Sequence, residues 1–197
     1  MIGYVFSLFT LIVTACIAQQ FVPVIGSLYE ARVLLVPLVF LCCAVTVSPS
    51  AMVILAFVGG FLWDAQHYSP PMEADKVYSE PVESLRFGYS VVLYGAMGFF
   101  MQGIQPLFRE GKWHVSALLS GAAIFLYLSA EYLLLTFVRG EIIVTKGLIL
   151  RISITSLLTM LFSPLVFWIL FQLSRLLRYT IRYEGFRKYR RHEREQL

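Results

Sequence analysis

Residues 148–173 read LILRISITSLLTMLFSPLVFWILFQL, a run in which Arg151 is the only charged residue. A helix needs about 20 apolar residues to cross the hydrocarbon layer of a bilayer, and this run is longer than that. The residues that follow, 175–197, are rich in arginine. An apolar run joined to a cationic end predicts a membrane-spanning helix whose last turn reaches a membrane surface.

The composition of the whole chain supports this prediction. Among its 197 residues, 58% are hydrophobic and 14% are charged, and the mean hydropathy is +0.74. These values leave too few polar side chains to cover a water-soluble globule, so the composition argues against a soluble fold. The three cysteines, Cys16, Cys42 and Cys43, lie inside apolar runs. We interpret them as buried hydrophobic residues rather than as a disulfide framework.

Five further apolar runs precede the one quoted above. Turn-forming or charged residues, such as Pro23 and Gly26, separate them. The six predicted spans are Tyr4–Val24, Val33–Val47, Ala51–Trp63, Phe87–Gln105, Val115–Val138 and Leu148–Leu173. The second and third are short, so either they cross with little tilt or one of them is partly buried in the bundle. The sequence therefore predicts an all-α membrane protein, with a bundle of six transmembrane helices over residues 1–174.

The distribution of lysine and arginine predicts the orientation of this bundle. In the six-span arrangement, ten of these 16 residues fall on the side of the C-terminal tail and six on the opposite side. Because positively charged segments are retained in the cytoplasm, both termini are predicted to be cytoplasmic, in a bacterial inner membrane. Residues 64–86, with a formal charge of −3, then form an external acidic loop, and residues 175–197 form a basic cytoplasmic tail.

The tail alternates cations with leucine, tyrosine and phenylalanine. If it continues the last span as a helix, it lays its aromatic rings on lipid while its cations meet anionic head groups. The cations considered for this membrane surface are Arg175, Arg178, Arg182, Arg187, Lys188, Arg190 and Arg191. Docking on a cytoplasmic protein is the alternative, and nucleic-acid binding is not expected of so short a stretch.

Two charged residues lie inside predicted spans. Glu131 is in the fifth span and Arg151 is near the start of the sixth. A lone charge at such a depth costs roughly 2.5 to 3.5 kcal/mol even on insertion scales, so another group must offset it. We expect Glu131 and Arg151 to form an intramembrane ion pair that holds neighbouring helices together. The alternatives are a role in binding or conduction, and separate snorkelling of the two side chains to the surface.

The residues that we consider for contact with a partner protein lie on the third and fourth spans. Asp64 stands where the third span ends, and there it caps a helix, is hydrated or meets a cation of a partner. Glycines recur in the fourth span and permit a close approach of another helix, either from the same bundle or from a partner. The candidates for the partner interface are Asp64, Gly88, Gly95, Gly98 and Gln102.

Gln102 and Gln105 are polar residues near the end of the fourth span. We interpret them as hydrogen-bond partners of other helices rather than as ligands for a substrate. Catalytic patterns are missing from the sequence. His67, His114 and His192 are far apart, and the sequence has no metal-binding or phosphate-binding motif. The sequence thus predicts a protein that is not an enzyme and has no cofactor or metal.

Three short motifs have a recognisable pattern. They are Gly59-Gly60-Phe61-Leu62-Trp63-Asp64, Phe87-Gly88-Tyr89-Ser90-Val91-Val92-Leu93-Tyr94-Gly95 and Ser163-Pro164-Leu165-Val166-Phe167-Trp168. Together with Arg32 and Pro37, they resemble the MreD family of rod shape-determining membrane proteins, and the resemblance covers nearly the whole chain. The family usually has a shorter link between the aspartate and the next glycine, so residues 71–86 look like an insertion.

The resemblance implies a six-helix fold similar to the substrate-binding subunits of energy-coupling-factor transporters. It also implies a non-enzymatic scaffold in the elongasome, which builds side-wall peptidoglycan and maintains cell shape. The implied partner is an MreC-like membrane protein and, through it, the elongation transpeptidase, its glycosyltransferase and MreB. The alternative function is a small-solute transport subunit of an energy-coupling-factor type system, with Glu131, Arg151 and Gln102 as polar contacts to the solute.

Overall fold

The computed structural model describes residues 2–67, 88–110, 113–139 and 145–179. These ranges form six α-helices and two short 3-10 helices, with no β-strand among them, so the predicted helical class is confirmed. In chain order the elements are α1 Ile2–Gln20, η1 Gly26–Leu28, α2 Leu35–Thr46, α3 Pro49–His67, α4 Tyr89–Ile104, η2 Gln105–Glu110, α5 Trp113–Arg139 and α6 Lys146–Leu176. Most of the predicted acidic loop lies outside the described residues.

Four of the described helices, α1, α3, α5 and α6, are long and apolar enough to cross a membrane. The other two, α2 and α4, are apolar but have 12 and 16 residues. At the usual rise per residue they measure about 18 and 24 Å, whereas a hydrocarbon layer is about 30 Å thick. The helix lengths are thus consistent with a membrane protein that combines four long helices with two shorter ones.

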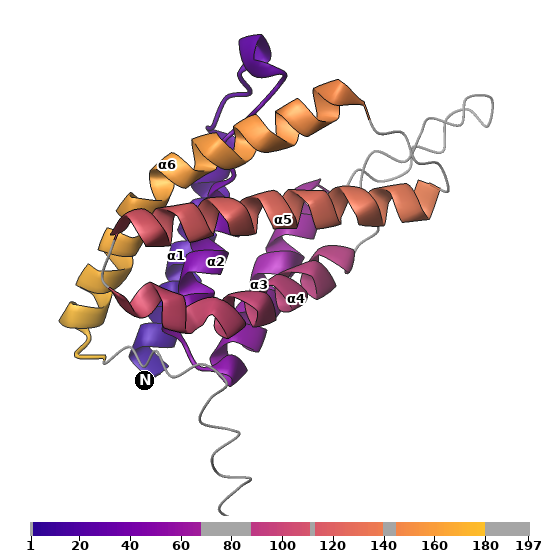
Figure 1. The fold of residues 1–197 in the computed structure, drawn as a ribbon. Coiled ribbons are helices and arrows are strands. Elements are labelled where there is room, and N and C mark those ends of the chain that lie inside the picture. The colour runs from indigo at the N-terminus through magenta and orange to yellow at the C-terminus, as the bar shows by residue number, and fades with distance from the viewer. Residues whose placement is uncertain (1, 68–87, 111–112, 140–144, 180–197) are drawn as a thin grey trace, which may run out of the picture.

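The short helix α2 lies at the centre of the bundle. Figure 1 shows α4, α5 and α6 in front of α1, α2 and α3, and α2 contacts each of the other five α-helices. Every residue of α2 from Val36 to Thr46 is buried. A helix that is apolar on all sides is suited to such a central position. Of the two expectations for the short second span, burial in the bundle is the one that the structure supports.

The start of α2 is capped by side chains from two other helices. The first N–H groups of any helix have no partner within that helix. Here the N–H of Leu35 donates to Oε1 of Gln19 at 2.6 Å, and the N–H of Leu34 donates to Oγ1 of Thr159 at 3.1 Å. The Gln19 amide also donates to the carbonyl of Val33 at 3.0 Å. Helices α1 and α6 therefore supply the cap that the apolar sequence of α2 lacks.

The end of α2 is capped in the same way by two glutamines. Nε2 of Gln102 donates to the carbonyls of Ala44 and Val47 at 2.6 and 2.9 Å. Nε2 of Gln105 donates to the carbonyl of Val45 at 2.6 Å. The last carbonyls of a helix would otherwise be unpaired in an apolar setting, which costs several kcal/mol per group in a membrane. The prediction that Gln102 and Gln105 form hydrogen bonds between helices is confirmed.

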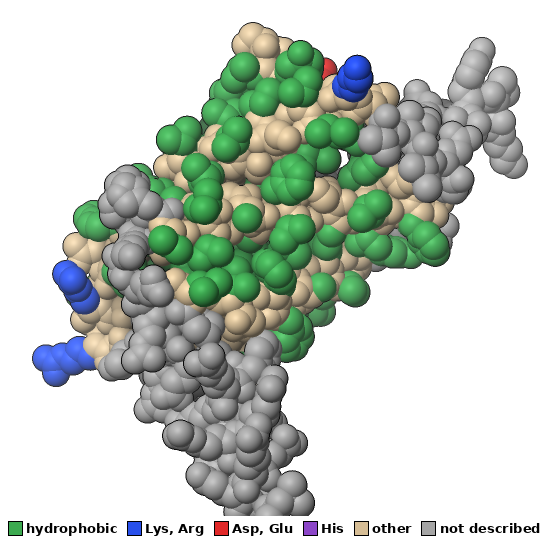
Figure 2. Space-filling model, in the orientation of Figure 1, with side chains coloured by type: hydrophobic (Ala, Val, Ile, Leu, Met, Phe, Trp, Pro, Cys, Tyr) green, Lys and Arg blue, Asp and Glu red, His purple; other side chains and the backbone are tan. Residues whose placement is uncertain are grey.

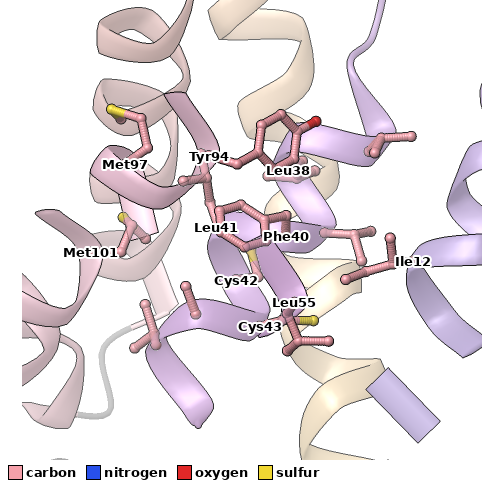
Figure 3. Close-up of a cluster of buried hydrophobic side chains, with 14 of the residues drawn as sticks. Ile12, Leu38, Phe40, Leu41, Cys42, Cys43, Leu55, Tyr94, Met97 and Met101 are labelled. Atoms are coloured by element: carbon pink, nitrogen blue, oxygen red, sulfur yellow. The ribbon is translucent and has the colours of Figure 1, made fainter. Parts of the chain in front are cut away.

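The hydrophobic core joins α2 to its neighbours. Figure 3 shows Phe40 of α2 beside Tyr94 of α4, and their ring centroids are 4.8 Å apart. Cys42 and Cys43 lie in the same cluster. Both thiols are free and buried, as is that of Cys16. The interpretation of the cysteines as buried hydrophobic residues is therefore confirmed.

Hydrophobic side chains also cover the outside of the bundle. Figure 2 shows them spread over the face on which α4, α5 and α6 lie. Examples with high exposure are Val92 on α4, Phe137 on α5 and Leu161 on α6. Water-soluble proteins rarely expose apolar surface on this scale, so the outer surface suits contact with hydrocarbon.

Candidate functional site

The carboxylate of Asp64 links α3 to the start of α4. The predicted third span ended at Trp63, but α3 continues to His67, so Asp64 lies inside the helix. Its Oδ2 accepts a hydrogen bond of 2.6 Å from the N–H of Gly88, which is the N-cap residue of α4. Gly88 has a φ of 100°, a value that residues with a side chain rarely adopt. Capping, one of the readings considered for Asp64, is thus the one that the structure supports.

A second close contact between the same two helices is made by glycine. A Cβ atom added to Gly60 would lie 2.5 Å from the Cα of Val91, so no larger residue fits there without moving backbone. At Gly59, an added Cβ would lie 3.2 Å from the ring of Tyr94. Glycine at helix interfaces lets backbones approach in this manner. No contact was predicted for Gly60. Two adjacent glycines within an apolar helix could have indicated that another helix packs closely there.

Glu131 of α5 lies close to this junction. Arg32, Trp63 and Asp64 all act electrostatically on its carboxylate, so these three residues lie near it. The rings of Tyr94 and Tyr127 meet edge to face nearby, with centroids 5.6 Å apart. We call the six residues Arg32, Trp63, Asp64, Tyr94, Tyr127 and Glu131 the junction cluster. It ties the segment before α2 to α3, α4 and α5.

The structure gives Glu131 and Arg151 different partners from those expected. Nη1 of Arg151 lies 3.8 Å from Oε2 of Glu30, and both side chains are more than half exposed. Glu131 instead has Arg32 and Trp63 beside it. The expected pair is therefore corrected to two separate interactions. The physical reason is that the chain before α2 carries two charges of opposite sign. Glu30 lies against Arg151 of α6, and Arg32 acts electrostatically on Glu131 of α5.

The partner-interface candidates on α4 divide into buried and open positions. Gly98 is buried against Met52 and Phe40, and the Gln102 side chain is only 2% exposed. Asp64 is also buried, at 6%. These residues form contacts within the bundle, and their contact with a partner stays a prediction. Gly95 differs, because a Cβ atom added there would meet nothing within 4 Å.

The end of α6 differs from the expected continuous helix. The helix stops at Leu176, and Arg178 adopts a φ of 49° that turns the chain. The N–H of Tyr179 donates to the carbonyl of Ser174 at 2.9 Å. The ring of Tyr179 then stacks on Tyr4 of α1, with centroids 4.3 Å apart. The tail therefore does not simply extend α6, and its residues Arg182, Arg187, Lys188, Arg190 and Arg191 lie outside the described part of the chain.

Residue types that bind metal ions do not gather at the junction cluster in the part of the chain that the structure describes. Among the described residues, no group of three or more histidine, cysteine, aspartate or glutamate side chains is placed to hold a metal ion. Asp64, Gln66 and Gln102 bond to the backbone of neighbouring segments. The hydroxyl groups of α5 instead donate to carbonyls of their own helix, as Ser120, Ser129 and Thr136 do. Comparison with known proteins adds no assignment, because no protein-family model, curated protein or solved structure matches this chain.

Proposed function

We propose that this chain is an MreD-type scaffold of the cell-elongation machinery and that it binds a membrane helix of an MreC-like partner. In this role it supports side-wall peptidoglycan synthesis and rod shape without catalysing a reaction. We further propose that all six α-helices are embedded in the inner membrane with both termini in the cytoplasm. The resulting bundle would be similar to the substrate-binding subunits of energy-coupling-factor transporters.

The positions of the motifs that resemble the MreD family support this proposal. The first two motifs meet where Gly60 packs on Val91 and Asp64 bonds to Gly88. The residues that carry the resemblance therefore determine how α3 holds α4. A scaffold requires a helix that is held closely on one side and exposed on the other. Helix α4 packs against α3 on one side and, among the described residues, is exposed on the other.

The free side of α4 is the single observation on which the proposed partner contact rests. Exposed residues recur on one face of the helix, and two of them are small: Val92, Ala96, Phe99, Phe100 and Gly103. The open position of Gly95 lies at the edge of this face. Small residues on a membrane helix let another helix approach closely. We therefore place the partner helix along this surface, which we call the α4 face.

The first experiment tests the α4 face in cells. A rod-shaped bacterium depleted of its own MreD would receive this chain together with its MreC-like partner, and cell shape would be measured. We expect the unaltered chain to restore rods and Ala96→Phe to leave cells round. The matched control is Ala122→Phe, the same substitution at an exposed position of α5, which should restore rods.

Crosslinking provides a direct measurement of the contact. Single cysteines at Ala96 and Gly103 should crosslink to cysteines placed along the membrane helix of the partner, whereas a cysteine at Leu133 should not. Equal crosslinking at all three positions would contradict the proposed surface. Rods that persist after depletion of this chain in its own host, with the partner still localised, would contradict the scaffold role itself.

The alternative function, a solute-transport subunit, would need Glu131, Arg151 and Gln102 to converge on one solute. Each of these side chains has a different partner. Gln102 caps α2, Arg151 pairs with Glu30, and Glu131 lies near Trp63 and Arg32. The separation of the three groups favours the scaffold over a binding protein that uses them together.

A further inference from the structure

A shallow, open groove lies along one face of the last turns of α6, on the side of the molecule where the chain leaves the bundle. It has a volume of about 580 Å³ and is lined by Trp168, Ile169, Gln172, Leu173, Arg175 and Leu176. The lining thus combines apolar side chains with one amide and one guanidinium group. This mixture differs from the rest of α6, whose exposed side chains are mostly apolar.

The exposed residues of this part of α6 follow a definite order along the helix. Leu161, Leu165 and Trp168 are 71%, 56% and 63% exposed. Gln172 and Arg175 follow them and are also exposed. Spacings of three and four residues place all five on one side of the helix. The rise of an α-helix puts about 21 Å between Leu161 and Arg175, so this face changes from apolar to cationic over the length of one lipid acyl chain and its glycerol.

Two features at the end of the helix add to the positive charge there. Arg175 lies in the last turn of α6. The unpaired carbonyls at the end of a helix favour a cation in this position. Arg178 follows in the turn that the Ser174–Tyr179 hydrogen bonds close, and Tyr179 is held by its stacking on Tyr4. Within the described part of the chain, Arg175 and Arg178 form no ion pair with a carboxylate. Both residues are also exposed.

We propose that this groove binds one acidic phospholipid of the membrane leaflet that faces the tail. The order of side chains matches the order of groups in such a lipid. Leu161 and Leu165 lie along an acyl chain, Trp168 lies at the level of the ester groups, and Gln172 donates to a glycerol or ester oxygen. Arg175 and Arg178 bind the phosphate, for which guanidinium groups are well shaped.

The order of groups also excludes a free phosphate ion as the natural occupant, because most of the groove is apolar. The proposal does not depend on the scaffold function. It requires only that α6 lies in a membrane, and it assigns a ligand class to residues that the scaffold proposal does not use.

Native mass spectrometry of the full chain in mild detergent tests the proposal. Phosphatidylglycerol and phosphatidylcholine with identical acyl chains would be titrated into the unaltered protein and into variants. We expect phosphatidylglycerol to bind more tightly, and Arg175→Gln to weaken its binding about fivefold, since a cation near an anionic surface contributes about that factor. Arg175→Lys should recover part of the loss. The matched control is Lys146→Gln, which removes one exposed cation at the other end of α6 and should leave binding unchanged.

Fluorescence locates the bound lipid. Phosphatidylglycerol with brominated acyl chains should quench tryptophan emission in the unaltered protein, and the Trp168→Phe variant should lose that part of the quenching. Inorganic phosphate should not compete with the lipid. Equal losses for Arg175→Gln and Lys146→Gln, or equal binding of the two lipids, would overturn the proposal. Competition by inorganic phosphate would also overturn it, because the groove would then be an anion site without a lipid component.

Discussion

The side chain of Gln19 forms two hydrogen bonds with the segment that starts α2, one from the N–H of Leu35 and one to the carbonyl of Val33. In this way α1 completes the backbone hydrogen bonding of a helix 16 residues further along the chain. Because α2 is buried and apolar, no water or polar side chain of its own replaces these bonds. The stability of the central helix therefore depends on its neighbours.

The Gln19→Leu variant tests this dependence. It leaves the N–H of Leu35 and the carbonyl of Val33 without the Gln19 amide, and the free energy of unfolding should fall by about 1 to 3 kcal/mol. Unfolding would be followed by circular dichroism in mixed detergent micelles. The matched control is Gln20→Leu, since Gln20 is exposed and the same substitution there should change stability little. Equal effects at the two positions would contradict the proposed cap.

The contact between α3 and α4 predicts a contrast between two glycines. Gly60→Ala places a methyl group against the backbone of Val91 and should destabilise the bundle by about 1 to 3 kcal/mol. Gly95→Ala, on the helix opposite, adds its methyl group in open space and should be neutral or slightly stabilising. The two variants would be compared in the same unfolding assay. A neutral Gly60→Ala would show that α4 does not approach α3 as closely as the structure indicates.

The Asp64 carboxylate predicts a graded response. Asp64→Ala removes the acceptor for the N–H of Gly88 and should cost about 1 kcal/mol or more, as for other helix caps. Asp64→Asn keeps an oxygen acceptor and should retain most of the stability. Gly88→Ala should also be destabilising, because the backbone there has a positive φ. If Asp64→Asn and Asp64→Ala are equally harmful, the negative charge rather than the cap is the important property.

Double-mutant cycles distinguish the two possible partners of Glu131. Glu131→Gln and Trp63→Phe should be coupled by about 0.5 kcal/mol or more, because the Trp63 side chain acts electrostatically on the nearby Glu131 carboxylate. Glu131→Gln and Arg151→Gln should be additive, because Arg151 lies against Glu30. Exchange of the charges of Glu131 and Arg151 should then fail to restore stability. Strong coupling to Arg151 would instead support the pair that the sequence alone suggested.

The sequence predicts correctly those properties that depend on the local run of residues. Gln102 and Gln105 were expected to bond to other helices because a buried amide in an apolar helix needs a partner, and they do so. The predicted partner of Arg151 was wrong. Arg151 lies against Glu30, which is in a turn outside the predicted spans, whereas the prediction compared only charges inside the spans. The prediction that the tail continues α6 as a helix was also wrong. The turn at Arg178 contains neither glycine nor proline, so the sequence has no local signal for it.

The amino-acid sequence by itself determined that this chain forms apolar helices with one cationic end, because helix length and hydrocarbon thickness can be compared residue by residue. Only the tertiary structure decided which helix is central, which glycines are in contact and which acid meets which base. Those relationships join residues such as Leu34 and Thr159, 125 positions apart. A long side chain bonds to whatever group the packing of helices brings within its reach, and that packing is a property of the whole bundle.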